Sequence, residues 1–247
     1  LPWFGGTPAV WSTVLLFFQA LLTGGYAYAY WLLGQRLRRQ GMVHLAVLGI
    51  SLALLVAGAL AWPSPLTPDA AWRPQAGEAP IWGVFRVLAV SVGVPYLLLS
   101  ANSTLVQGWF SRDDAGQAPY RLYALSNVGS LVGLVSYPLI FEPNLSVRAQ
   151  AYAWSAGYVL FALATGYLAL RWSRRTEAAE AQPAASEEAA EAKRPGAGVH
   201  LLWVALAACA STLLVAVSNQ VTQEVAPMPF LWVLPLTVYL LSFILAF

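Results

Sequence analysis

Few residues of this chain have side chains that could do chemistry, and these few are far apart in the sequence. His44 and His200 each stand alone at the edge of an apolar segment, and Cys209 is the only cysteine. A catalytic or zinc site needs several such groups at a defined spacing, and the sequence has no phosphate-binding loop, serine-hydrolase motif or dinucleotide fingerprint. The sequence therefore predicts that this chain is not an enzyme, holds no metal or cofactor and binds no nucleic acid.

Arg86 is the one basic residue well inside a long apolar segment, and Glu142 ends the next such segment on the same side. An ionisable group in an apolar segment of this length is costly unless it finds a partner or reaches water. We therefore expect a structural ion pair between Arg86 and Glu142. A role for Arg86 in binding a substrate is the alternative.

Uncharged polar residues inside the apolar segments are more numerous than charged ones. Such groups either hydrogen-bond between helices or line a polar cavity, and the sequence leaves both roles open. The candidates for a substrate path are Gln19, Asn102, Gln107, Ser126 and Asn127.

Residues that disturb or closely pack helices are also concentrated in the apolar segments. Gly93 and Pro95 lie near the middle of one segment and Pro235 near the middle of another, so helix kinks are expected at both prolines. Gly129 and Gly133 have the GxxxG spacing that lets two helices approach closely.

The elements that must position these residues are apolar and long. Apolar residues make up 59% of the chain and charged residues 10%, against roughly 25% charged in soluble domains. A hydrocarbon core needs roughly 20 apolar residues as helix, whereas a barrel strand would show about ten alternating ones. An all-α, polytopic transmembrane bundle is therefore expected, with seven segments at about 8–34, 42–62, 81–108, 122–141, 151–172, 200–222 and 225–247.

The loop charges predict the orientation. One alternate set of loops holds ten basic residues and the other only Arg73 and Arg148, so the first set is expected to be cytoplasmic. The basic set is Arg36, Arg38, Arg39, Arg112, Arg121, Arg171, Arg174, Arg175, Lys193 and Arg194. On the outer side, Trp62, Trp72 and Trp82 flank the proline-rich loop 63–80 and are expected at the membrane interface.

Composition divides the chain into three parts. Residues 173–199 contain much Ala, Glu and Pro and no aromatic residue, which predicts a disordered cytoplasmic linker. We therefore expect an N-terminal membrane bundle at 1–172 and the start of a second bundle at 200–247.

Several stretches resemble a bacterial family of fused major-facilitator and spermidine-synthase-like membrane proteins. They are LPWFGGTPAVW at 1–11, LLFFQALLTGGYAYAY at 15–30, SANSTLVQGWF at 100–110, PYRLYALSNVGSLVGLVSYPLIFEP at 119–143 and PFLWVLPLTVYLLSFILAF at 229–247. The resemblance implies a major-facilitator-like fold in a bacterial inner membrane, followed in the family by a soluble aminopropyltransferase-like domain that this chain lacks.

The chain starts without Met and stops in an apolar run, so we expect a fragment whose missing helices are its partners. With one helix missing before Leu1, the visible segments become helices two to eight of a twelve-helix transporter. The linker 173–199 then falls at the long central loop of that fold, and the loop 34–41 resembles a degraded form of its basic loop.

Two functions follow as expectations. The first is a module that binds or moves a small polar or amphipathic solute, alone or as the transporter-derived part of a fused spermidine-synthase-like protein. The second is a non-transporting anchor or scaffold for an attached or partner aminopropyltransferase-like enzyme. A polyamine substrate is indicated only by the family's fusion partner, and the segments lack the buried carboxylates that a polycation needs.

Overall fold

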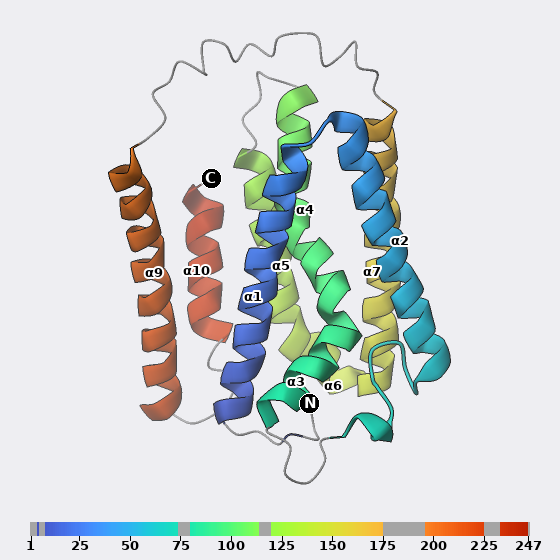
Figure 1. Ribbon diagram of the computed structural model, residues 1–247. Helices are drawn as coiled ribbons and strands as arrows, with labels where there is room; N and C mark the ends of the chain where they lie inside the picture. The colour runs from blue at the N-terminus through green and yellow to red at the C-terminus, as the bar shows by residue number, and fades with distance from the viewer. Residues whose placement is uncertain are drawn as a thin grey trace. The chain divides into compact units, whose positions relative to one another are not determined.

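The computed structural model describes Phe4 and residues 8–73, 80–113, 120–174, 196–224 and 233–246, and these residues are almost entirely helical (Figure 1). The α-helices are α1 (Pro8–Leu33), α2 (Leu37–Ala61), α3 (Pro80–Leu88), α4 (Val94–Asp113), α5 (Tyr120–Ser136), α6 (Glu142–Asn144), α7 (Val147–Ser173), α9 (Ala197–Glu224) and α10 (Val233–Ala246). Short elements are the 3₁₀ turn η1 (Ala70–Trp72) and the π-helical turns η2 (Ala89–Gly93) and η3 (Tyr137–Phe141).

Within the described residues, six helical segments are long and apolar enough to cross a bilayer. These segments are Val10–Leu33, Leu37–Ala61, Ile81–Ser111, Leu122–Asn144, Val147–Ser173 and Ala197–Val217. They confirm the all-helical, multi-pass membrane architecture, because only helices or closed barrels satisfy their backbone groups in lipid. The seventh predicted segment, 225–247, is described only from Val233, as the shorter apolar helix α10.

The described helices form two compact units. The first unit contains α1, α2, α3, η2, α4 as far as Phe110, and α7, while the second contains α5, η3, α6, α9 and α10. The predicted first bundle, 1–172, includes residues 120–144. In the structure, the contacts of these residues group them with α9 and α10. The boundaries at 172 and 200 stay a prediction, and most of the predicted linker, residues 175–195, lies outside the described residues.

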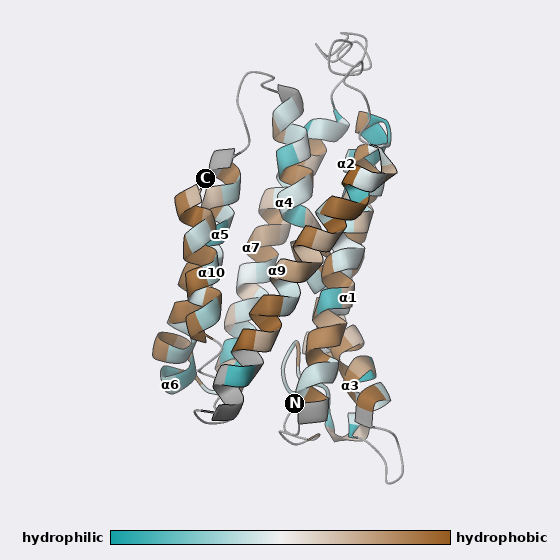
Figure 2. Ribbon diagram, turned by 90° about the vertical axis from the view of Figure 1, so that its left-hand side faces the viewer, coloured by the Kyte–Doolittle hydropathy of each residue, from teal (hydrophilic) through white to brown (hydrophobic). Residues whose placement is uncertain are grey.

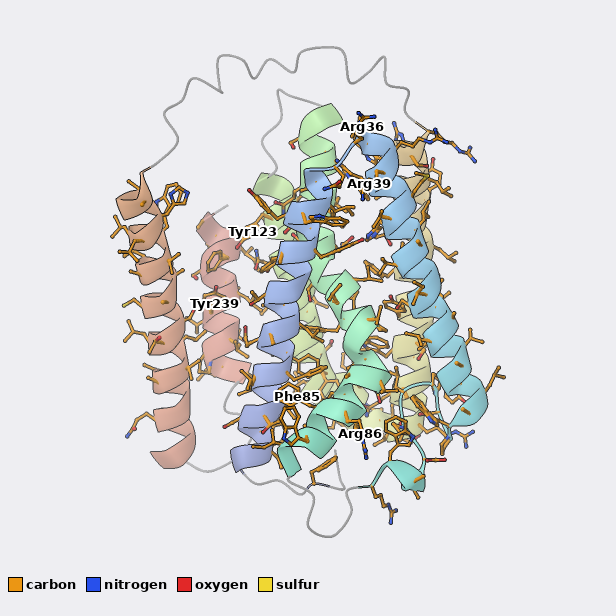
Figure 3. All side chains as sticks on the ribbon, viewed as in Figure 1. Arg36, Arg39, Phe85, Arg86, Tyr123 and Tyr239 are labelled. Atoms are coloured by element: carbon orange, nitrogen blue, oxygen red, sulfur yellow. The ribbon has the colours of Figure 1, made fainter. Side chains whose placement is uncertain are left out.

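The first unit has a basic end, where α1 meets α2 near Arg36 and Arg39, and an opposite end near Arg86 (Figure 3). Helices α1, α4 and α7 run toward the basic end and α2 runs away from it (Figure 1). Four small apolar clusters hold the unit together, of which one joins Leu48, Leu98 and Ala162 from three helices.

Small residues set how closely these helices approach. A Cβ atom on Gly25 would stand 2.5 Å from Ser100 Cβ, so α1 and α4 cross there almost backbone to backbone. A Cβ on Gly41 would collide with the Ala169 carbonyl oxygen of α7. By contrast, nothing lies within 4 Å of such an atom on Gly129 or Gly133. The GxxxG prediction of close packing is therefore wrong for the part of the chain that the structure describes.

Prolines account for the two π-helical turns. A proline lacks the N–H that would bond to the carbonyl four residues earlier, and its ring crowds that carbonyl. Four residues before Pro95 and Pro143 are Ser91 and Leu139, the central residues of η2 and η3. Widening the turn relieves the clash, so each π-helical turn is explained by the proline that follows it in the sequence.

The kink expected at Pro235 stays a prediction. The described part of α10 begins at Val233, and residues 225–232, which a kink at this proline would involve, lie outside the described residues. The described part of α10 contains no interruption at this proline.

In the second unit, α5 packs along α10. The Tyr123 ring of α5 lies 5.9 Å from the Phe243 ring of α10, which in turn lies 4.8 Å from the Tyr239 ring (Figure 3). The described side chains of α9 are almost all exposed, and the most buried of them is only half-buried.

Candidate functional site: a polar face of α1 and α4

One side of α4 is polar along most of the helix. Tyr96, Ser103 and Gln107 follow one another at spacings of seven and four residues, which places them on one side of a helix with 3.6 residues per turn. The side that packs on α2 and α7 carries Leu98 and Trp109 instead, both buried. Figure 2 shows hydrophilic colour at several levels of α4.

Helix α1 has a matching polar side. Gln19, Thr23 and Tyr26 follow one another at spacings of four and three residues, and all three are exposed. The buried side of the same helix carries Phe17 and Leu32, which pack against α3 and α4. On each helix, buried apolar residues therefore face the unit's core.

The two polar sides adjoin each other. Phe18 of α1 meets the Tyr96 ring edge to face at 4.7 Å, and Gly25 touches Ser100. We call the surface formed by Gln19, Thr23, Tyr26, Tyr96, Ser103 and Gln107 the α1–α4 polar face.

Local hydrogen bonds use only part of the bonding capacity of this face. Thr23 Oγ1 donates to the Gln19 carbonyl oxygen at 3.0 Å, and Gln107 Nε2 donates to Ser103 Oγ at 3.0 Å. Among the described residues, no partner binds the side-chain amide of Gln19. Polar groups left in hydrocarbon cost several kcal/mol each, roughly 2–7 by transfer scales, so this face is suited to water, solute or protein rather than lipid.

Two of the predicted path residues lie on the α1–α4 polar face, about three helical turns apart along it. Gln19 and Gln107 belong to the α1–α4 polar face, while Asn102 lies about 140° around α4 from Gln107 and is half-buried. Ser126 and Asn127 lie on α5 in the second unit, where Asn127 Nδ2 donates to the Tyr123 carbonyl oxygen at 2.9 Å. Their part in one shared path stays a prediction.

Sequence reasoning missed the two tyrosines of the face. Tyr26 and Tyr96 resemble interfacial or core aromatics when each is read alone. The signal that could have found them was the helical spacing that joins each tyrosine to amides and hydroxyls on the same side.

A second polar group lies near the basic end, where Gln40, His44 and Trp109 are buried and Tyr28 is half-buried. The Gln40 amide donates to the carbonyl oxygens of Leu33 at 3.1 Å and Gln35 at 2.6 Å, and its Oε1 accepts from Trp109 Nε1 at 3.0 Å. One turn further along α2, His44 Nδ1 shares a 3.1 Å hydrogen bond with the Tyr28 hydroxyl. We call Tyr28, Gln40, His44 and Trp109 the inner polar network.

His44 is therefore part of the core of the unit, with its side chain only 1% exposed. A further buried bond, 2.6 Å between the hydroxyl oxygens of Ser51 and Tyr158, joins α2 to α7. Both sets join helices that are far apart in sequence, so we assign them to holding the unit together rather than to contact with a solute.

Arg86 has a partner that the sequence did not indicate. Its guanidinium carbon lies 5.5 Å from the centre of the Trp72 ring, and Trp72 meets Trp62 edge to face at 6.0 Å. A cation over an indole face is an attractive contact of about 0.5–1 kcal/mol at an exposed site. Glu142 belongs to the other unit, so the expected Arg86–Glu142 pair stays a prediction.

The described residues contain no group of three His, Cys, Asp or Glu side chains that could hold a metal ion. Comparison of the chain with protein-family models, curated proteins and solved structures gives no match.

Proposed function

We propose that this chain is a major-facilitator-like module of a bacterial inner membrane that binds or moves a small polar or amphipathic solute. The α1–α4 polar face is the observation that carries this proposal. It places amide, hydroxyl and phenol groups along one side of each of two adjacent helices. A surface of this kind is stable in a membrane when it lines a polar path between helices.

The chemistry of the face favours a solute without net charge. Its six side chains offer hydrogen-bond donors and acceptors and two aromatic rings, and none belongs to Asp, Glu, Lys or Arg. A polycation would need carboxylates to replace its lost hydration. A polyamine substrate, which the family resemblance implies through its fusion partner, is therefore the less favoured choice.

The π-helical turns are consistent with this function. In many transporters, interrupted helices place backbone groups beside a central site. Here η2 interrupts the same span that contributes Tyr96, Ser103 and Gln107. The span can thus present both side-chain and backbone polar groups to one path.

The test is uptake into proteoliposomes by the full-length protein, with labelled spermidine and a panel of uncharged sugars and polyols as probes. Tyr26→Phe and Gln107→Leu should each lower the flux of a transported probe at least tenfold while leaving the melting temperature nearly unchanged. Tyr167→Phe is the matched control, because Tyr167 of α7 is 66% exposed on another helix and loses the same hydroxyl. Equal flux in all three variants would remove the α1–α4 polar face from the path.

A scaffold without transport, holding an attached or partner aminopropyltransferase-like enzyme, is the second candidate. The inner polar network and the Ser51–Tyr158 bond favour it, because their polar groups are bonded to each other. If no probe moves, and Tyr26→Phe and Gln107→Leu leave the activity of the associated enzyme unchanged, the scaffold becomes the better account.

A further inference from the structure

Two exposed arginines lie at the same level where α2 and α7 cross at the basic end of the first unit. Gly41 of α2 lies against Ala169 and Ser173 of α7, so the first turn of α2 is beside the last turn of α7. Arg38 lies almost one turn before Gly41, and Arg174 directly follows Ser173. Both membrane spans have an end here, which puts the two arginines at the level of lipid headgroups.

On α2, the arginine lies on the side that faces away from the unit's core. Gln40 and His44 are buried and bond to residues of α4 and α1. In a helix with 3.6 residues per turn, Arg38 falls on the other side of Gly41 from these two residues. One turn deeper than Arg38 is Met42, which is 49% exposed. This side of α2 therefore carries a charged group above an exposed apolar one.

Helix α7 has the same arrangement. Trp172 is buried against Trp109 of α4, with 6.2 Å between the ring centres. Arg174 falls on the other side of the α2 contact from Trp172, and Leu170, one turn deeper, is 42% exposed. Because the two helices are antiparallel and each turns its buried residues toward the core, both arginines lie on the same outer side of the crossing.

The two helices contain nothing that neutralises these arginines. Neither α2 nor α7 has an Asp or Glu residue. Within the described parts of the chain, neither the Arg38 nor the Arg174 guanidinium makes a hydrogen bond or an ion pair. Exposed arginines at the same end add to the positive potential, namely Arg36, Arg39 and Arg171. An anion from outside the two helices is therefore attracted to this site.

We propose that the outer side of the α2–α7 crossing binds one anionic phospholipid at the basic end. Arg38 and Arg174 bind its phosphate oxygens, for which the planar guanidinium is well suited. Met42 and Leu170 contact the upper part of an acyl chain. A lipid fits better than a soluble anion, because it supplies a negative charge and an apolar chain at the two depths where the helices offer their complements. The proposal requires only that the first unit spans a bilayer, and it does not depend on solute transport.

Native mass spectrometry of the full-length protein in detergent tests the site. The probe is dioleoyl phosphatidylglycerol, and the reference is dioleoyl phosphatidylcholine, which has the same chains and no net charge. The parent protein should bind the probe clearly more tightly than the reference. Arg38→Gln and Arg174→Gln should each weaken binding of the probe about fivefold, with binding of the reference and the melting temperature nearly unchanged.

Arg148→Gln is the matched control, because Arg148 is an exposed arginine at the other end of α7 and loses the same charge. This variant should bind the probe as the parent does. Equal binding of the two lipids by the parent, or an equal loss of probe binding in all three variants, would overturn the proposal.

Two further measurements separate the lipid from other sources of negative charge. Glycerol 3-phosphate, which has the charged group without the chains, should not displace the probe even in large excess, and displacement would refute the part given to Met42 and Leu170. The chain's own glutamates between residues 177 and 191 are the competing occupant. Changing all of them to glutamine should leave probe binding at the parent level. Tighter binding in that variant would show that these carboxylates occupy the arginines, and the proposal would fail.

Discussion

Gly41 is the position where one methyl group should disturb the first unit most. A Cβ atom there would collide with the Ala169 carbonyl oxygen and stand 2.7 Å from Ser173 Cβ and 2.9 Å from Ser173 N. Carbon atoms pack at about 3.5–4.0 Å, so the contact with Ser173 falls short by about 1 Å. Two of the three neighbours are backbone atoms of α7, which cannot rotate away, so α2 and α7 must separate.

Gly49, on the same helix, provides a matched control. Nothing lies within 4 Å of a Cβ atom at Gly49, which is exposed. Gly-to-Ala replacement inside a helix favours the folded state by about 1 kcal/mol, and this gain is shared by both variants. The difference between them is therefore the overpacking cost alone, roughly 1–3 kcal/mol.

The assay is thermal unfolding of the full-length protein in detergent, followed by tryptophan fluorescence. For a chain of this size, 1 kcal/mol corresponds to about 2–4 °C, so Gly41→Ala should melt roughly 2–12 °C below Gly49→Ala. Equal melting temperatures would show that α2 and α7 do not cross at Gly41, and the reasoning from close approach would fail.

Two further predictions concern the buried hydrogen bonds of the first unit. Gln40→Leu should destabilise the protein by about 1–3 kcal/mol, because Trp109 Nε1 loses its acceptor, and a blue-shifted or broadened tryptophan emission should accompany the lower melting temperature. Ser51→Ala and Tyr158→Phe should each cost about 0.6 kcal/mol, the typical size of a hydrogen bond between membrane helices, and the double variant should cost no more than either single one. Additive losses in the second case would show that the two hydroxyl groups do not bond to each other.

Much of the architecture was predictable because the bilayer imposes it. A long apolar run without backbone partners elsewhere must be helical in lipid, so the segments at 8–34, 42–62 and 151–172 agree with α1, α2 and α7 to within a few residues at most ends. The interruption before Pro95 was predictable for a similar reason, since proline acts on its own helix.

Contacts between helices were much less predictable. The GxxxG pair at Gly129 and Gly133 has the right spacing but no close neighbour among the described residues, while Gly25 and Gly41, outside any such motif, carry the close crossings. A glycine permits close approach, but only the position of the second helix decides whether approach occurs. The role of a glycine in helix packing can therefore be predicted only when the helix that faces it is known.

The sequence by itself determined the helical membrane fold class and the small number of ionisable and nucleophilic side chains. Apolar runs of about 20 residues, ten basic residues in one set of loops and a single cysteine are properties of the chain that no packing can change. Tertiary structure alone decided which polar residues lie near one another. It buried His44 beside Tyr28, placed Arg86 over Trp72, and set Tyr96 of α4 against Phe18 of α1. These relations depend on how helices far apart in sequence rotate and contact each other. The pattern of residues within one segment carries no information about that packing.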